Sequence, residues 1–112
     1  MATWIGEHAG KPFIRVIINS AMPPEILILA ADVRANGTGE ITEVNGDLEH
    51  EEVVLRRELE NGVLRIQARQ DDEDVVDYQM RVAGEGTASL QLLQPSGMKP
   101  FQLKRIPNRL SK

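Results

Sequence analysis

The sequence predicts an all-β fold, a barrel or a sandwich of short antiparallel strands, and three observations support this prediction. Runs of alternating apolar and polar residues recur about every ten residues through the second half of the chain. Gly, Asn and Asp, which favour turns, separate these runs. The two ends also match, because Trp4 and Arg105 suit the first and last strands of a sheet that closes on itself.

The strands of the second half each place apolar side chains on one face and polar side chains on the other, as antiparallel sheets with one solvated face do. They cover residues 64–69, 76–82, 87–92 and 101–104. Asn61-Gly62 predicts a two-residue hairpin before the first of these strands. The remaining turns fall at the acidic residues 71–74 and at residues 83–86 and 94–97.

In the first half, residues 13–19 predict a strand with Ile14, Val16 and Ile18 on one face. Residues 41–44 and 53–59 predict two more strands, joined by a charged segment that we expect to be a polar loop at residues 45–52. Together these elements give about eight or nine strands.

Residues 25–34 are compatible with two structures. Pro24, the acid that follows it and Asn36-Gly37 at the other end suit a helix. The β-branched residues of the segment and the hairpin signal at residues 35–38 favour a strand, which is the preferred prediction. Such a strand would be apolar on both faces, so a helix, a loop or another subunit would have to cover its outer side.

Length predicts a single domain over residues 1–112, with a flexible tail at residues 107–112. The absence of cysteine excludes disulfides and thiolate metal sites. The net charge of −4, without a basic face, argues against nucleic-acid binding. No apolar run is long enough to span a membrane, and we expect no signal peptide, because residues 1–3 lead almost directly into Trp4. The compartment stays open between a cytoplasmic protein and a domain excised from a longer or secreted one.

Several short motifs follow the order found in a family of bacterial lipocalin-like, calycin-type domains. They are Trp4-Ile5-Gly6, Gly10-Lys11-Pro12-Phe13, Asn36-Gly37-Thr38-Gly39, Asn61-Gly62-Val63-Leu64-Arg65-Ile66, Gly86-Thr87-Ala88-Ser89-Leu90 and Pro100-Phe101-Gln102-Leu103-Lys104-Arg105. The chain resembles these domains over nearly its whole length, although Ala2 replaces a usual Gly and residues 45–52 are unusually charged. The resemblance implies a small antiparallel up-and-down β-barrel. It implies no single activity, because such domains bind varied small apolar molecules or serve as accessory modules.

The resemblance also implies that Trp4 lies under the closed end of the barrel with Arg105 over it. The alternation agrees, because Arg105 shares the parity of Phe101 and Leu103 and would point inward. An inward guanidinium needs a partner, and a tryptophan face with backbone carbonyls supplies one worth about 1–2 kcal/mol when desolvated. We predict barrel closure, rather than a cation or anion site, for this pair.

No arrangement of residues in the sequence predicts catalysis or a cofactor. His8 and His50 lie beside carboxylates but match no zinc motif. The acidic turn at residues 71–74 lacks the glycine and the final glutamate of a calcium-binding loop. No Gly-x-Ser-x-Gly nucleophile motif is present. We expect no enzyme activity, no catalytic residue and no metal ligand.

The inward apolar positions are the remaining candidate site, because a barrel of about eight strands is just wide enough to be filled by side chains or to hold one small ligand. The residues expected to line such a cavity are Ile14, Val16, Ile66, Tyr78, Met80, Leu90 and Phe101. An aromatic content of 4% favours a filled interior instead. Two functions follow: binding of a small apolar ligand in the barrel, or a non-enzymatic structural or interaction module that forms a homodimer through Ile26 to Val33.

Overall fold

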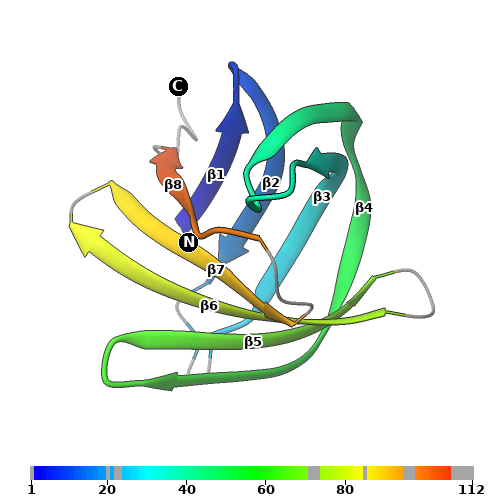
Figure 1. Cartoon of the computed structure of the whole chain (residues 1–112). Helices are drawn as coiled ribbons and strands as arrows, with labels where there is room; N and C mark the ends of the chain where they lie inside the picture. The colour runs from blue at the N-terminus through cyan, green and yellow to red at the C-terminus, as the bar shows by residue number, and fades with distance from the viewer. Residues whose placement is uncertain are drawn as a thin grey trace, which may run out of the picture.

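The structure is a computed structural model that describes residues 2–19, 21, 24–70, 74–84, 86–94 and 98–106. These residues form eight antiparallel strands that close into a barrel (Figure 1). Each strand pairs with the next in sequence, and the last pairs with the first. The strands are β1 (Ala2–His8), β2 (Lys11–Ile18), β3 (Ile26–Ala35), β4 (Ile41–Glu60), β5 (Val63–Gln70), β6 (Asp74–Gly84), β7 (Thr87–Gln94) and β8 (Phe101–Ile106). The prediction of an all-β, up-and-down antiparallel barrel is confirmed.

Strand β3 covers most of the segment, residues 25–34, for which the sequence allowed either a strand or a helix. It pairs with β2 from Ile14 opposite Ala30 to Ile18 opposite Ile26, and Ile28 is buried in the interior. Its outer face is only partly covered, because Leu27 keeps 36% of its surface exposed. The segment is thus a strand with one buried face and one half-covered face.

Strand β4 differs from the prediction, because residues 45–52 are not a loop between two strands. They belong to one strand of 20 residues that bends where its register against β3 jumps from Asn45 opposite Asp32 to His50 opposite Ala30. Gly46, with φ of 82°, allows this bend. The bent part lies beside the outer face of β2 and β3, so that a strand of the same chain supplies part of the expected cover.

Strands β1 and β8 close the barrel. Trp4 lies opposite Arg105 in their register, and the Arg105 backbone N–H also donates to the Gly86 carbonyl oxygen at 2.9 Å. Trp4 is buried, but Arg105 is exposed at the end of the barrel, so its guanidinium is not desolvated as the alternation suggested. Closure therefore rests on backbone pairing and on the buried indole.

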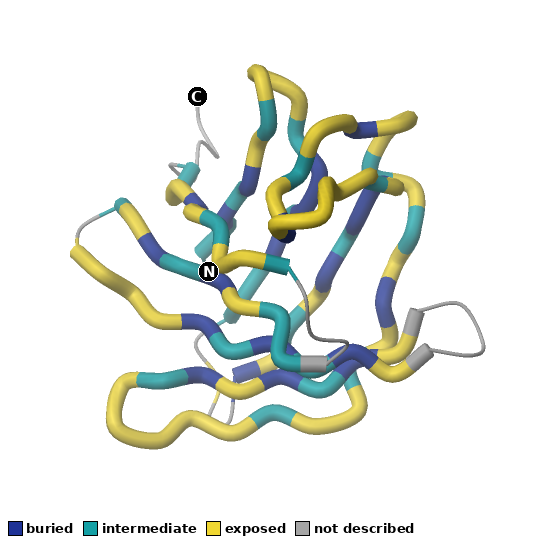
Figure 2. Tube along the Cα trace, viewed as in Figure 1, coloured by how far each residue is buried: buried dark blue, intermediate teal, exposed yellow. Residues whose placement is uncertain are grey.

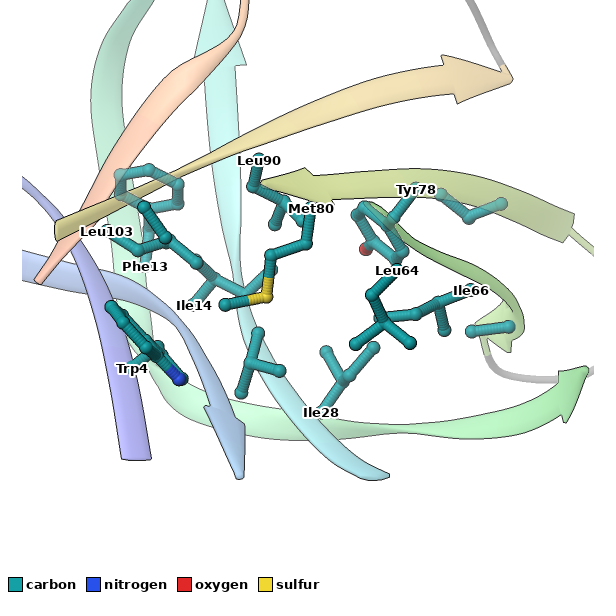
Figure 3. Close-up of a cluster of buried hydrophobic side chains, with 14 of the residues drawn as sticks. Trp4, Phe13, Ile14, Ile28, Leu64, Ile66, Tyr78, Met80, Leu90 and Leu103 are labelled. Atoms are coloured by element: carbon teal, nitrogen blue, oxygen red, sulfur yellow. The ribbon is translucent and has the colours of Figure 1, made fainter. Parts of the chain in front are cut away.

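Every strand contributes buried or partly buried residues (Figure 2), and a cluster of buried apolar side chains fills the middle of the barrel (Figure 3). The largest of the fully buried side chains are Ile28, Ile66, Leu90, Leu103, Glu52 and Val16. All of these except Glu52 are apolar. Glu52 lies on β4, in the segment that was predicted to be a loop. The acidic residues 71–73, the turn at 95–97 and the tail at 107–112 lie outside the described residues.

Gly6 on β1 makes room for side chains of the neighbouring strands. A Cβ atom at this position would lie 3.0 Å from Ile14 Cγ2, 3.1 Å from Leu103 Cδ2 and 3.2 Å from Phe13 Cζ. The absence of a side chain therefore lets β2 and β8 pack closely over β1.

Gly6→Ala is expected to lower the free energy of unfolding by about 1–3 kcal/mol, because three packed side chains must shift. Urea denaturation measures this change. Gly37→Ala is the matched control, since a Cβ there meets no atom within 4 Å. Equal losses of stability in the two variants would contradict the close packing at Gly6.

Two hairpins use two-residue turns in which both residues have positive φ, at Ala9-Gly10 (53° and 79°) and at Asn61-Gly62 (54° and 78°). The second confirms the hairpin predicted from the sequence. Asn adopts this conformation readily, whereas Ala meets a steric penalty. Ala9 is therefore a strained position.

Ala9→Asn is expected to raise the free energy of unfolding by about 1 kcal/mol, because it relieves the left-handed strain. The reciprocal change Asn61→Ala is expected to lower the free energy of unfolding by a similar amount. Thermal and urea unfolding of both variants check this. A destabilised Ala9→Asn protein would refute the assignment of strain to Ala9.

Candidate functional site

The interior opens into a cavity of about 290 Å³ at the end of the barrel where β3 and β7 finish and β4, β6 and β8 begin. We call this the mouth cavity. Its lining consists of Phe13, Ile14, Ala30, Ala31, Asp32, Val33, Ile41, His50, Val76, Tyr78, Leu92, Met98 and Phe101. The small side chains of Ala30 and Ala31 leave space on the β3 side. The middle of the barrel, by contrast, is filled.

Aromatic side chains converge on the mouth cavity from three strands. Phe13 comes from β2, Tyr78 from β6 and Phe101 from β8. The two phenylalanine rings form an edge-to-face pair, with centroids 5.0 Å apart and planes at 76°. Since the chain has 2 Phe, 1 Tyr and 1 Trp, every aromatic residue except Trp4 lines this cavity.

A buried hydrogen bond holds Tyr78 in place. Its hydroxyl donates to the Glu52 carboxyl, with Oη 2.9 Å from Oε1 and 3.0 Å from Oε2. Glu52 points into the barrel opposite Ile28 and is only 2% exposed. A carboxyl group buried to this extent requires such partners, because the loss of hydration is costly. The bond links β4 to β6 across the intervening β5.

Asp32 and His50 supply the rest of the polar wall. His50 Nε2 lies 3.5 Å from Asp32 Oδ1, with 43% of the histidine side chain and 74% of the aspartate side chain exposed. Both residues line the mouth cavity together with Tyr78. The wall thus runs from the exposed Asp32 to Tyr78, which is backed by the buried Glu52.

The short segment before β8, with Met98 and Lys99, lies at the edge of the mouth cavity. The Lys99 backbone N–H donates to the Gly39 carbonyl oxygen at 2.9 Å, and Lys99 Nζ lies 3.8 Å from Glu40 Oε2. These contacts join the segment before β8 to the β3–β4 hairpin, although β4 and β8 are not neighbours in the barrel. Met98, next to Lys99, lines the cavity.

The residues expected to line an interior cavity separate into three groups. Ile14, Tyr78 and Phe101 line the mouth cavity. Met80 lines a second hollow of about 280 Å³ at the opposite end of the barrel, together with Trp4. Val16, Ile66 and Leu90 are at most 2% exposed and belong to the packed core.

The polar wall was missed by the sequence analysis, which assigned His50 and Glu52 to a loop. Leu48, His50, Glu52 and Val54 are each less exposed than the residues between them, as alternation in a strand requires. The sequence carries only a weak sign of this face, because the outward Val53 and Leu55 are as apolar as the inward Leu48 and Val54. The charge of the segment hid the pattern.

Within the described part of the chain, no group of three or more His, Cys, Asp or Glu side chains is arranged to hold a metal ion. Over the same residues, no helix has the length and apolar character needed to cross a membrane. Comparisons with protein-family models, curated proteins and solved structures give no significant match.

Tyr78→Phe is expected to lower the free energy of unfolding by about 1–3 kcal/mol, because the buried Glu52 carboxyl loses a hydrogen-bond donor. The same change in a Glu52→Met background is expected to cost less, since no carboxyl is then left without this donor. Urea unfolding of the unchanged protein, the two single variants and the double variant gives the coupling free energy between Tyr78 and Glu52. Additive effects would contradict the interaction.

Proposed function

We propose that the barrel binds a small, largely apolar molecule in the mouth cavity. The observation that carries this proposal is the convergence of Phe13, Tyr78 and Phe101 on one hollow in a chain with few aromatic residues. Ligand cavities are typically lined by apolar and aromatic side chains with a few polar groups. The mouth cavity has both kinds of lining. Burial of the ligand's apolar surface would supply most of the binding free energy.

The volume of the cavity limits the size of the ligand. At about 290 Å³, the hollow lies near the lower end of the usual range for ligand pockets, roughly 300–1,000 Å³. The filled core beyond it, including Val16 and Leu90, leaves no deep extension. We therefore infer a compact ligand, such as a single ring with a short substituent, held at the mouth.

The lipocalin-like motifs support the same proposal, since domains of that kind bind varied small apolar molecules. The wall also supplies polar groups that are held in place, because Tyr78 donates to Glu52 and His50 lies against Asp32. In this proposal these groups orient the ligand and carry out no reaction.

The second candidate is a homodimer formed through the outer face of β3. Ile28 and Ala30 of this segment are buried in the barrel, so its exposed apolar surface is centred on Leu27 and on Val53 of the adjacent β4, which are 36% and 50% exposed. Sedimentation equilibrium tests this candidate. A monomer over a wide concentration range would count against it and would leave the ligand proposal untouched.

For the ligand proposal, 2-phenylethanol is a neutral probe of suitable size. In a titration followed by amide chemical shifts, we expect the largest changes at residues that line the mouth cavity. Ala31→Leu fills part of the cavity and is expected to weaken binding by about tenfold or more. Ala83→Leu adds the same atoms at an exposed position of β6 and is the control. Equal affinities of the two variants would contradict the site.

A further inference from the structure

The mouth cavity has one carboxylate in its lining and a second carboxyl group behind the lining. Asp32 contributes a carboxylate to its lining, and the buried Glu52 lies directly behind Tyr78 at hydrogen-bond distance. No lysine or arginine is among the described residues that line the cavity. Lys99 lies next to the lining residue Met98, but its ammonium group is paired with Glu40. His50, paired with Asp32, is the basic group of the lining.

The apolar part of the lining can also interact with a positive charge. The rings of Phe13 and Phe101 are edge-to-face, so the edge of one ring points toward the face of the other. Faces of aromatic rings attract ammonium groups, and the attraction grows when water is excluded. Phe13 is 5% exposed, and Phe101 is partly buried.

We propose that the ligand of the mouth cavity is a small aromatic or aliphatic amine, whose ammonium group faces the wall formed by Asp32, His50 and Tyr78. This inference rests on the proposed ligand-binding function and adds the chemistry of the ligand's polar group. In its ionised form, Glu52 attracts the cation through a poorly solvated region, where charges are weakly screened. Asp32, which is largely exposed, contributes at shorter range and is screened by salt.

The same arrangement discriminates between ligands of similar shape. An ammonium group gains from the negative charge of Asp32, whereas a carboxylate in its place would be repelled by that charge. A hydroxyl group gains hydrogen bonds, but it is neither attracted nor repelled as a charged group is. The structure therefore orders three otherwise similar ligands as amine, alcohol and carboxylate, from the tightest to the weakest.

The test is a titration of the protein with 2-phenylethylamine, 2-phenylethanol and phenylacetate, followed by amide chemical shifts at neutral pH. We expect the amine to bind about tenfold more tightly than the alcohol, and phenylacetate to bind more weakly than either. If the alcohol or phenylacetate binds as tightly as the amine, the inference is overturned while the proposed function stands. If no probe binds, the proposed function fails, and the inference fails with it.

Two variants locate the source of the preference. Glu52→Gln keeps the size of the side chain and an oxygen that can accept from Tyr78, and we expect it to reduce the amine's advantage over the alcohol severalfold. Asp32→Asn changes a side chain that is 74% exposed and keeps the inference testable if the Glu52 variant does not fold. Glu43→Gln is the control, because Glu43 lies outside the cavity lining and is paired with Arg34 at 3.7 Å. An amine preference that survives in both Glu52→Gln and Asp32→Asn contradicts the assignment of the wall.

Discussion

The hydrogen bond between Tyr78 and Glu52 is the interaction on which the organisation of this barrel depends. A carboxyl group that is 2% exposed must be hydrogen bonded, and the donor comes from a strand two places away. The bond therefore adds a side-chain link inside the barrel between β4 and β6, which the backbone holds together only through β5. It also holds the only tyrosine of the chain in one orientation, with its ring in the wall of the mouth cavity.

The size of the barrel explains why the cavity lies at one end. Eight strands enclose a space that side chains nearly fill, and Ile28, Ile66 and Leu90 occupy its middle. At the mouth, the side chains of Ala30 and Ala31 are smaller than those in the middle of the barrel. They leave a hollow between β3 and the aromatic rings. The site is thus a local departure from a packed core. The Tyr78–Glu52 pair supplies one part of the polar wall, and Asp32 and His50 supply the rest.

The sequence predicted the architecture well because its signals are local. Alternation marks the strands of the second half, and Asn61-Gly62 specifies its hairpin through the conformations of two residues alone. The parity of Arg105 was informative about register, since Arg105 does lie opposite Trp4. Its exposure could not be predicted, because parity gives the face of a strand and not the distance from the end of the barrel.

The site could be predicted only in part, because it depends on residues distant in sequence. Ile14, Tyr78 and Phe101 were among the expected lining residues, but the overall aromatic content gave no sign that three rings meet in one place. His50 and Glu52 were assigned to a loop because charged residues rarely point into a barrel. Their role appears only when the partner of each, Asp32 and Tyr78, is placed beside it by the fold.

The state of the Tyr78 hydroxyl proton tests this account most directly. Because the chain has one tyrosine, a proton NMR spectrum contains at most one tyrosine hydroxyl signal. We predict a resolved signal that exchanges slowly with water and shows nuclear Overhauser effects to the Tyr78 ring and to the Glu52 side chain. A hydroxyl proton that exchanges freely with water, with no contact to Glu52, would contradict the buried pair and the polar wall built on it.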